Sequence, residues 1–175
     1  MFSEPEKNID QFHIDPGMVV ADLGAGTGAY AFPLAKAVGP SGKVYAVDVQ
    51  KELIAKLKSD ANQKQITNIE IIWGDLDDPK GTTLRESSVD RIVVANTFFQ
   101  IEDKDEFMKE VHRILRTNGL LLFIDWKGSF GGVGPKGEDI VTPDVVRTLF
   151  EDAGFTFERD VQAGDHHYGM IFKEL

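Results

Sequence analysis

Apolar runs and helical patterns alternate along this chain. Near-continuous apolar runs lie at residues 18–23, 43–48, 69–73, 89–95 and 119–125. Such runs are typical of parallel strands that are covered on both faces. Between them, apolar residues recur at helical spacing, for example at Phe107, Val111 and Ile114. This alternation predicts an α/β fold with a mainly parallel sheet.

Two closing runs, at residues 155–160 and 167–173, follow. The six residues between them are too few for a helical crossover, so we expect these two strands to pair antiparallel. The segment 127–141, before these runs, contains five glycines. We expect it to form a mobile loop over the edge of the sheet.

Local signals set the helix boundaries. Asp103, followed three positions later by Glu106, predicts a capping box at the start of a helix that ends at Asn118-Gly119. Pro33 lies inside the predicted helix that follows a glycine-rich turn, where it removes a backbone hydrogen bond. Either that helix starts late, near Ala29, or it is kinked, and we favour a proline in the first turn.

Composition narrows the class of protein. A chain of 175 residues, 42% hydrophobic and 27% charged, predicts one globular domain over residues 1–175 with a short N-terminal segment at 1–15. The net charge of −10 argues against a nucleic-acid partner, which requires clustered Lys and Arg. No apolar stretch has membrane-spanning length, and we expect a cytoplasmic protein that does not enter a membrane. The absence of cysteine excludes thiolate metal sites, and we expect no metal ligands.

The turn at Gly24–Gly28 carries the most information about function. Asp22 comes just before this turn, Asp48 ends the second apolar run, and Asp75 follows the third. The carboxyl ends of parallel strands meet at one edge of a sheet, where ligands bind in open α/β folds. Three carboxylates at that edge suit a ligand with a ribose, an amine and an adenine.

The same turn also satisfies the dinucleotide fingerprint G-x-G-x-x-G/A, so an NAD-binding protein is an alternative. Two features favour the first interpretation. Asp22 is useful beside an ammonium or sulfonium group and unhelpful beside a pyrophosphate. The chain also has no predicted second domain to hold a hydride donor or acceptor.

These motifs together resemble those of class I S-adenosylmethionine-dependent methyltransferases. The resemblance rests on the first motif, Asp22–Gly28, on the acids Asp48 and Asp75, on the fourth-strand segment Asp90–Asn96, and on the turn Leu115–Leu122. Within the class, the chain is similar to small proteins related to ubiquinone/menaquinone-biosynthesis methyltransferases. The resemblance implies a Rossmann-like sheet of seven strands in the order 3-2-1-4-5-7-6, with strand 7 antiparallel and helices on both faces. It also implies S-adenosylmethionine as the cofactor.

Residue roles follow from this resemblance. The implied cofactor-binding residues are Asp22, Gly24, Gly26, Gly28, Asp48, Val49, Asp75, Leu76 and Asn96. In the implied arrangement, Asp48 accepts hydrogen bonds from both ribose hydroxyls and Asp75 accepts one from the adenine amino group.

The methyl acceptor is less well defined. The candidates for a general base are Asp125, His166 and His167, and the candidates for the substrate side are Phe98, Phe99, Gln100, Trp126, Phe130 and Tyr168. Because neighbouring strand residues point to opposite faces, we expect at most one of the two histidines to face the cofactor. The candidate acceptors are a small molecule and a protein. A homodimer is a candidate assembly. The alternative to an enzyme is a non-catalytic cofactor-binding subunit. The absence of cysteine disfavours arsenite and pyrimidine-C5 methylation.

Overall fold

The computed structural model describes residues 4–175, so residues 1–3 of the predicted N-terminal segment lie outside the described part. The strands are β1 (Val19–Leu23), β2 (Lys43–Asp48), β3 (Ile69–Trp73), β4 (Val89–Ala95), β5 (Leu115–Trp126), β6 (Phe155–Val161) and β7 (His167–Glu174). The α-helices are α1 (Pro5–Asp10), α2 (Ala31–Val38), α3 (Lys51–Gln63), α4 (Lys104–Ile114) and α5 (Pro143–Asp152), and the short 3-10 helices are η1 (Phe98–Gln100) and η2 (Gly137–Asp139).

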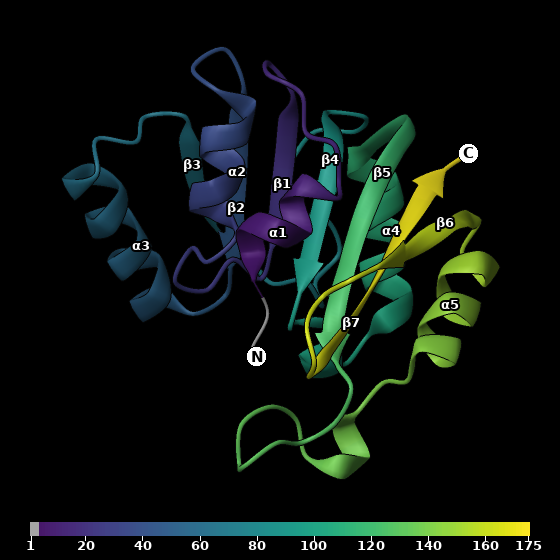
Figure 1. The fold of residues 1–175 in the computed structure, drawn as a ribbon. Coiled ribbons are helices and arrows are strands. Elements are labelled where there is room, and N and C mark those ends of the chain that lie inside the picture. The colour runs from purple at the N-terminus through teal and green to yellow at the C-terminus, as the bar shows by residue number, and fades with distance from the viewer. Residues whose placement is uncertain (1–3) are drawn as a thin grey trace.

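The strands form a seven-stranded sheet in the order β3-β2-β1-β4-β5-β7-β6 (Figure 1). Strands β1 to β5 run parallel, whereas β7 runs antiparallel to both β5 and β6. The expected fold class and strand order are therefore confirmed. Because β7 runs against β5, the start of β7 lies at the carboxyl end of β5, with Trp126 opposite His167.

Helices cover both faces of the sheet. On one face, α4 and α5 bury a cluster that includes Phe123 and Phe150. On the other face, α1, α2 and α3 bury a second cluster that includes Val20, Leu34 and Leu57. Because successive residues of a strand point to opposite faces, both clusters draw on the same strands, and this explains their near-continuous apolar sequences.

Two predicted boundaries meet different outcomes. Pro33 lies in the first turn of α2, as favoured from the sequence. The prediction that α4 ends at Asn118-Gly119 is wrong, because the helix ends at Ile114 and Leu115 already has extended backbone. The amides of Ser87 and Ser88 donate to carbonyls in the last turn of α4, so β5 starts directly at the end of the helix.

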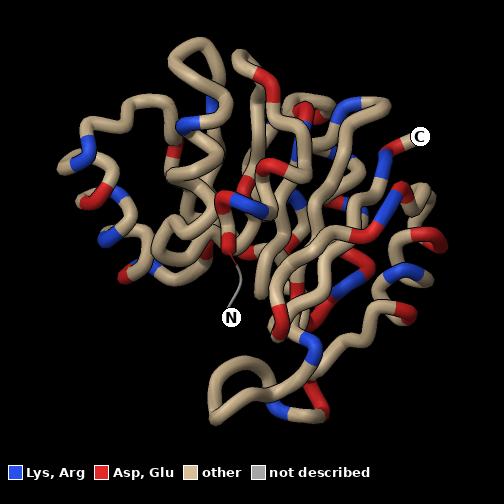
Figure 2. Tube along the Cα trace, viewed as in Figure 1, with Lys and Arg blue, Asp and Glu red and all other residues tan. Residues whose placement is uncertain are grey.

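Among the helices of residues 4–175, none combines the length and apolar character needed to cross a membrane. Acidic residues lie at the edge where the central strands end, at the bottom of the sheet in this view (Figure 2). The loop between β5 and α5 extends below the same edge (Figure 1).

Candidate functional site

A tight glycine turn connects β1 to α2. The amides of Gly24 and Ala25 both donate to the carbonyl oxygen of Val47, at 2.9 and 3.0 Å, so the turn is held against the end of β2. Gly24 has φ +83°, and a Cβ atom at this position would lie 2.1 Å from the side-chain oxygen of Thr97. The close approach of β4 to the turn therefore requires glycine at position 24.

Asp48 connects this turn to the start of α3. One carboxylate oxygen accepts the amide of Gly26 at 2.8 Å, and the other accepts the amide of Gln50 at 2.8 Å. The side chain is buried but lines the pocket described below. Each oxygen of a carboxylate accepts more than one hydrogen bond, so both retain capacity toward a ligand.

Asp22 is a buried carboxyl group at the end of β1. Its side chain is 2% exposed, and its Oδ2 atom has no hydrogen-bond partner among the described residues. Burial and, to a smaller extent, the charge of Asp48 raise the pKa of Asp22, the amide of Ala31 lowers it, and the net result is a pKa of about 7. Asp22 is therefore poised to lose its proton when a cation binds beside it.

The segment after β3 forms another side of the site. The amide of Asp77 donates to Asp75 at 3.0 Å, and Asp77 in turn accepts the amides of Glu102 and Asp103, each at 2.8 Å. Asp103 also caps α4 by accepting the amide of Glu106 at 2.9 Å, which confirms that half of the predicted capping box. The loop that carries Asp75 is thus fixed to the start of α4.

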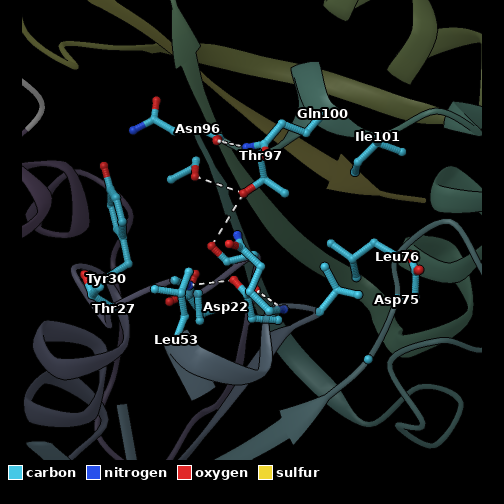
Figure 3. Close-up of a pocket in the computed structure, with 18 of the residues that line it drawn as sticks. Asp22, Thr27, Tyr30, Leu53, Asp75, Leu76, Asn96, Thr97, Gln100 and Ile101 are labelled. Atoms are coloured by element: carbon cyan, nitrogen blue, oxygen red, sulfur yellow. Dashed lines mark hydrogen bonds between the residues drawn. The ribbon is translucent and has the colours of Figure 1, made fainter. Parts of the chain in front are cut away.

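These elements enclose a pocket of about 320 Å³. Its lining includes eight of the nine predicted cofactor residues, namely Asp22, Gly24, Gly26, Asp48, Val49, Asp75, Leu76 and Asn96. Tyr30 lies at one end of the pocket, whereas Asp75 and Leu76 lie at the other (Figure 3). Among the described lining residues there are four aspartates and no Lys or Arg, so the pocket is electronegative.

Gly28, the ninth predicted cofactor residue, does not line this pocket in the described structure. It has φ +91°, and a Cβ atom there would lie 2.5 Å from Leu57 and 2.8 Å from Phe32. Its glycine is therefore explained by the packing of α2 against α3.

Asp125 and Tyr168 lie opposite each other on β5 and β7. Asp125 is 2% exposed, and its Oδ2 atom has no partner among the described residues. Burial raises the pKa of Asp125 to about 6, although the amides of Trp126 and Phe99 and the charge of Lys104 lower it. The hydroxyl group of Tyr168 donates to the carbonyl of Val141 at 2.6 Å, which fixes the far end of the glycine-rich loop to β7.

Trp126 and His167 form the next pair, on the opposite face of the sheet. Their rings lie 4.2 Å apart, and His167 is 2% exposed with neither ring nitrogen bonded to a described residue. Burial lowers the pKa of His167 to about 4, so its imidazole is neutral at physiological pH. Gly134, in the glycine-rich loop, packs on the indole of Trp126, where a Cβ atom would lie 2.9 Å from the ring.

The glycine-rich loop has further contacts with the start of β7. The ring of Phe130 lies 4.2 Å from that of His166, and the amide of Lys127 donates to the carbonyl of His166 at 2.8 Å. Phe130 and Val133 exchange two backbone hydrogen bonds. Residues 127–141 therefore contact β5 and β7 at both ends of the segment and at Phe130 and Gly134.

The predicted substrate-side residues lie in different parts of the fold. Phe98 is fully buried in the core against Phe107, Phe123 and Phe150, so it does not form a wall of the pocket. Gln100 lines the pocket. Trp126 and Tyr168 lie at the end of β5 and the start of β7, Phe130 lies in the loop against His166, and Phe99 directs its amide toward Asp125.

Comparison with known proteins identifies the family. A family model described as a methyltransferase domain matches residues 14–142. A crystal structure of an S-adenosylmethionine-dependent methyltransferase from Aquifex aeolicus is 32% identical to this chain and superposes with a TM-score of 0.90. The match covers 99% of this chain and 91% of that one. The chain belongs to the class I S-adenosylmethionine-dependent methyltransferases.

Curated relatives of this methyltransferase carry different acceptors in their names. An arsenite methyltransferase from Aquipseudomonas alcaligenes is 33% identical over 114 residues, which is 62% of this chain and 33% of the relative. A demethylmenaquinone methyltransferase from a Geobacillus species is 22% identical over 120 residues, which is 69% of this chain and 50% of the relative. This methyltransferase therefore spans between a third and a half of the length of these relatives.

Sequence reasoning missed several residues of the methyltransferase pocket. Tyr30, Gln50, Asp77 and Thr97 line it as well. The spacing of Asp77 two positions after Asp75 was a usable signal, because Asp side chains commonly accept nearby backbone amides. The sequence held no comparable signal for Tyr30, whose place depends on how α2 packs.

Proposed function

We propose that this chain transfers the methyl group of S-adenosylmethionine to an acceptor bound at the carboxyl ends of β4, β5 and β7. The observation that carries the proposal is the pocket itself, in which Asp22, Asp48 and Asp75 surround one cavity with no Lys or Arg in its described lining. A pyrophosphate would be repelled there, whereas an ammonium or sulfonium group would be attracted.

The polar groups of the pocket fit the parts of this cofactor. In this arrangement Asp48 accepts the two ribose hydroxyls with the capacity left after its two amide bonds. Asp75 and Leu76 take the adenine end. The methionyl amine lies beside Asp22 and Asn96, each of which has a buried side-chain oxygen without a partner in the described structure. Buried orphan acceptors of this kind are explained when a ligand supplies the donor.

The cofactor supplies an activated methyl group, and the protein supplies orientation. An in-line displacement requires the acceptor atom on the side of the sulfonium away from the departing sulfur. Proximity and alignment contribute up to about 7–11 kcal/mol in such reactions. A proton released by the acceptor is taken up by Asp125 or His167, which are both largely in their basic forms at pH 7.

The acceptor that we propose is an organic molecule or a protein side chain. Arsenite binding by soft thiolate ligands is not available to this chain, because its sequence contains no cysteine. The segment 127–141 borders the acceptor side, and its rearrangement would open the region of Trp126 and His167.

Calorimetry and a product assay test the proposal together. Titration with S-adenosylmethionine, S-adenosylhomocysteine and NAD should give signals for the first two compounds alone. Purified protein should then form S-adenosylhomocysteine from S-adenosylmethionine with a metabolite extract or with a protein extract, and the productive arm identifies the acceptor class. Asp48→Ala is the control for cofactor-dependent product.

Two outcomes would contradict the proposal. Binding of NAD without binding of S-adenosylmethionine would overturn the cofactor assignment. Binding of S-adenosylmethionine without turnover in either extract would favour a non-catalytic subunit.

A further inference from the structure

The helix α1 buries a polar side chain that faces the N-cap residue of α2. Asn8 is 1% exposed, although asparagine is mostly a surface residue in proteins. Its amide nitrogen donates to the hydroxyl oxygen of Tyr30 at 2.8 Å, across 22 positions of sequence. Tyr30 is itself 6% exposed and lines the pocket.

Contacts with the rest of the fold must determine the position of α1. A helix of six residues is too short to be stable in isolation. Ile9 and Phe12 anchor it in the core, and Gln11 binds the turn between β6 and β7. Gln11 donates to the carbonyl of Gln162 at 3.2 Å and accepts the amide of Gln162 at 3.0 Å. Asn8 is the point where this anchored segment contacts the wall of the pocket.

Tyr30 connects this contact to the buried acid at the end of β1. It is the N-cap residue of α2, directly before Ala31, whose amide faces Asp22. Tyr30 lies at the end of the pocket away from Asp75 and Leu76 (Figure 3). A hydrogen bond that fixes Tyr30 therefore also constrains the backbone that supports Asp22.

We infer that Asn8 is a positioning residue for the cofactor: it holds Tyr30 against the methionyl end of S-adenosylmethionine and so makes α1 part of the cofactor site. The inference rests on the proposed function, which places adenosine at Asp48 and Asp75 and the methionyl group beside Asp22. A change at Asn8 should then weaken binding of the amino-acid part of the ligand and not binding of its adenosine part.

Two nucleoside ligands separate these parts. S-Adenosylhomocysteine has the adenosine and the amino-acid moiety, whereas 5′-methylthioadenosine has the adenosine and lacks the amino-acid moiety. Calorimetry should show that Asn8→Leu raises the dissociation constant for S-adenosylhomocysteine about three- to tenfold, the range of one neutral hydrogen bond of about 0.5–1.5 kcal/mol. The dissociation constant for 5′-methylthioadenosine should stay within about twofold.

Matched variants make the test specific. Gln11→Ala removes the contacts of α1 with the β6–β7 turn and leaves the contact with Tyr30, so it should leave the affinity ratio of the two ligands unchanged. Tyr30→Phe removes the same hydrogen bond from the other side and should reproduce the effect of Asn8→Leu. The double variant should be little weaker than either single variant, because both changes remove the same Asn8–Tyr30 hydrogen bond.

The possible outcomes are distinct. Equal weakening of both ligands by Asn8→Leu, or the same change of ratio in Gln11→Ala, would show a general loosening of α1 and overturn the inference. Unchanged affinity in Asn8→Leu would also overturn it, and if that variant does not fold, unchanged affinity in Tyr30→Phe decides in the same way. If the unaltered protein binds neither nucleoside, the proposed function itself has failed.

Discussion

Replacing Asp22 by asparagine should make the stability of the ligand-free protein less sensitive to a rise in pH from about 4 to about 7. The pKa of Asp22 rises from 3.8 to about 7 in the folded state because the side chain is buried beside Asp48. The folded state then binds more protons than the unfolded state between these two values, so the free energy of unfolding falls as the pH rises from about 4 to about 7. Asn at this position carries no titrating group, and this part of the pH dependence disappears.

The size of the effect follows from the shift. Each pKa unit corresponds to about 1.36 kcal/mol, so the raised pKa costs the folded protein about 4 kcal/mol once Asp22 is fully ionised. Part of this cost is already present at pH 5, and the part that develops between pH 5 and pH 8 is about 2–3 kcal/mol. The Asp22→Asn variant should therefore gain about 2–3 kcal/mol relative to the unaltered protein between these two pH values.

Urea unfolding at pH 5 and pH 8 without ligand measures this difference. Comparing the two pH values cancels any constant packing cost of the amide group. Asp152→Asn, an exposed change at the end of α5, is the control and should show little difference between the two pH values. If Asp22→Asn changes the free energy of unfolding equally at pH 5 and pH 8, then Asp22 does not carry the raised pKa and the reasoning fails. The same variant should bind S-adenosylmethionine more weakly, because the ligand's ammonium group loses a carboxylate partner.

Three other changes have defined outcomes. Asp48→Ala should raise the dissociation constant for S-adenosylhomocysteine about ten- to hundredfold in calorimetry, because losing the charged hydrogen bonds of Asp48 to the ligand should cost about 1.5–3 kcal/mol in total, and an unchanged value would remove Asp48 from the site. Gly24→Ala should lower the free energy of unfolding by at least about 2 kcal/mol, because of the positive φ at this position and the clash of the new Cβ atom with Thr97. Gly26→Ala has open space at its Cβ position and should lower the free energy of unfolding less in the same urea titration. Equal losses in the two variants would contradict the clash. Once an acceptor is known, kcat should rise with pH through about 6 if Asp125 accepts the proton, and a rise that persists in Asp125→Asn would exclude it.

The topology could be predicted because it depends on patterns that are local in sequence. Strand runs, the glycine turn and the acids at strand ends each occupy a few consecutive residues, and parallel strands necessarily bring those acids to one edge. The end of α4 could not be predicted in this way. Asn118 and Gly119 are typical of a helix end, but pairing of Leu115 with Val89 extends the strand back to Leu115.

The parts of the site that sequence reasoning missed depend on long-range packing. The sequence does not show which side of the sheet Phe98 faces. Phe98 lies in the 3-10 helix η1 after β4, where the alternation of a strand no longer sets the direction of a side chain. Nor does the sequence show that Asn8 contacts Tyr30, since the contact depends on how α1 lies over the sheet. The pattern of acids predicts the cofactor half of the site, whereas the proposed acceptor half is built from β5, β7 and the loop 127–141, whose side chains meet only in the folded protein.

The two tryptophans give this protein an internal optical reporter for each half of the site. The indole of Trp73 is 54% exposed at the end of β3, and its N–H group donates at 2.8 Å to the carbonyl of Val49, a residue of the cofactor pocket. Trp126 lies between the loop and His167, on the proposed acceptor side. If the proposed function holds, the fluorescence of Trp126→Phe should respond to a ligand at the end of β3, and that of Trp73→Phe should respond to changes beside the loop. Events on the two sides of the sheet edge can thus be followed separately in one chain without any added dye.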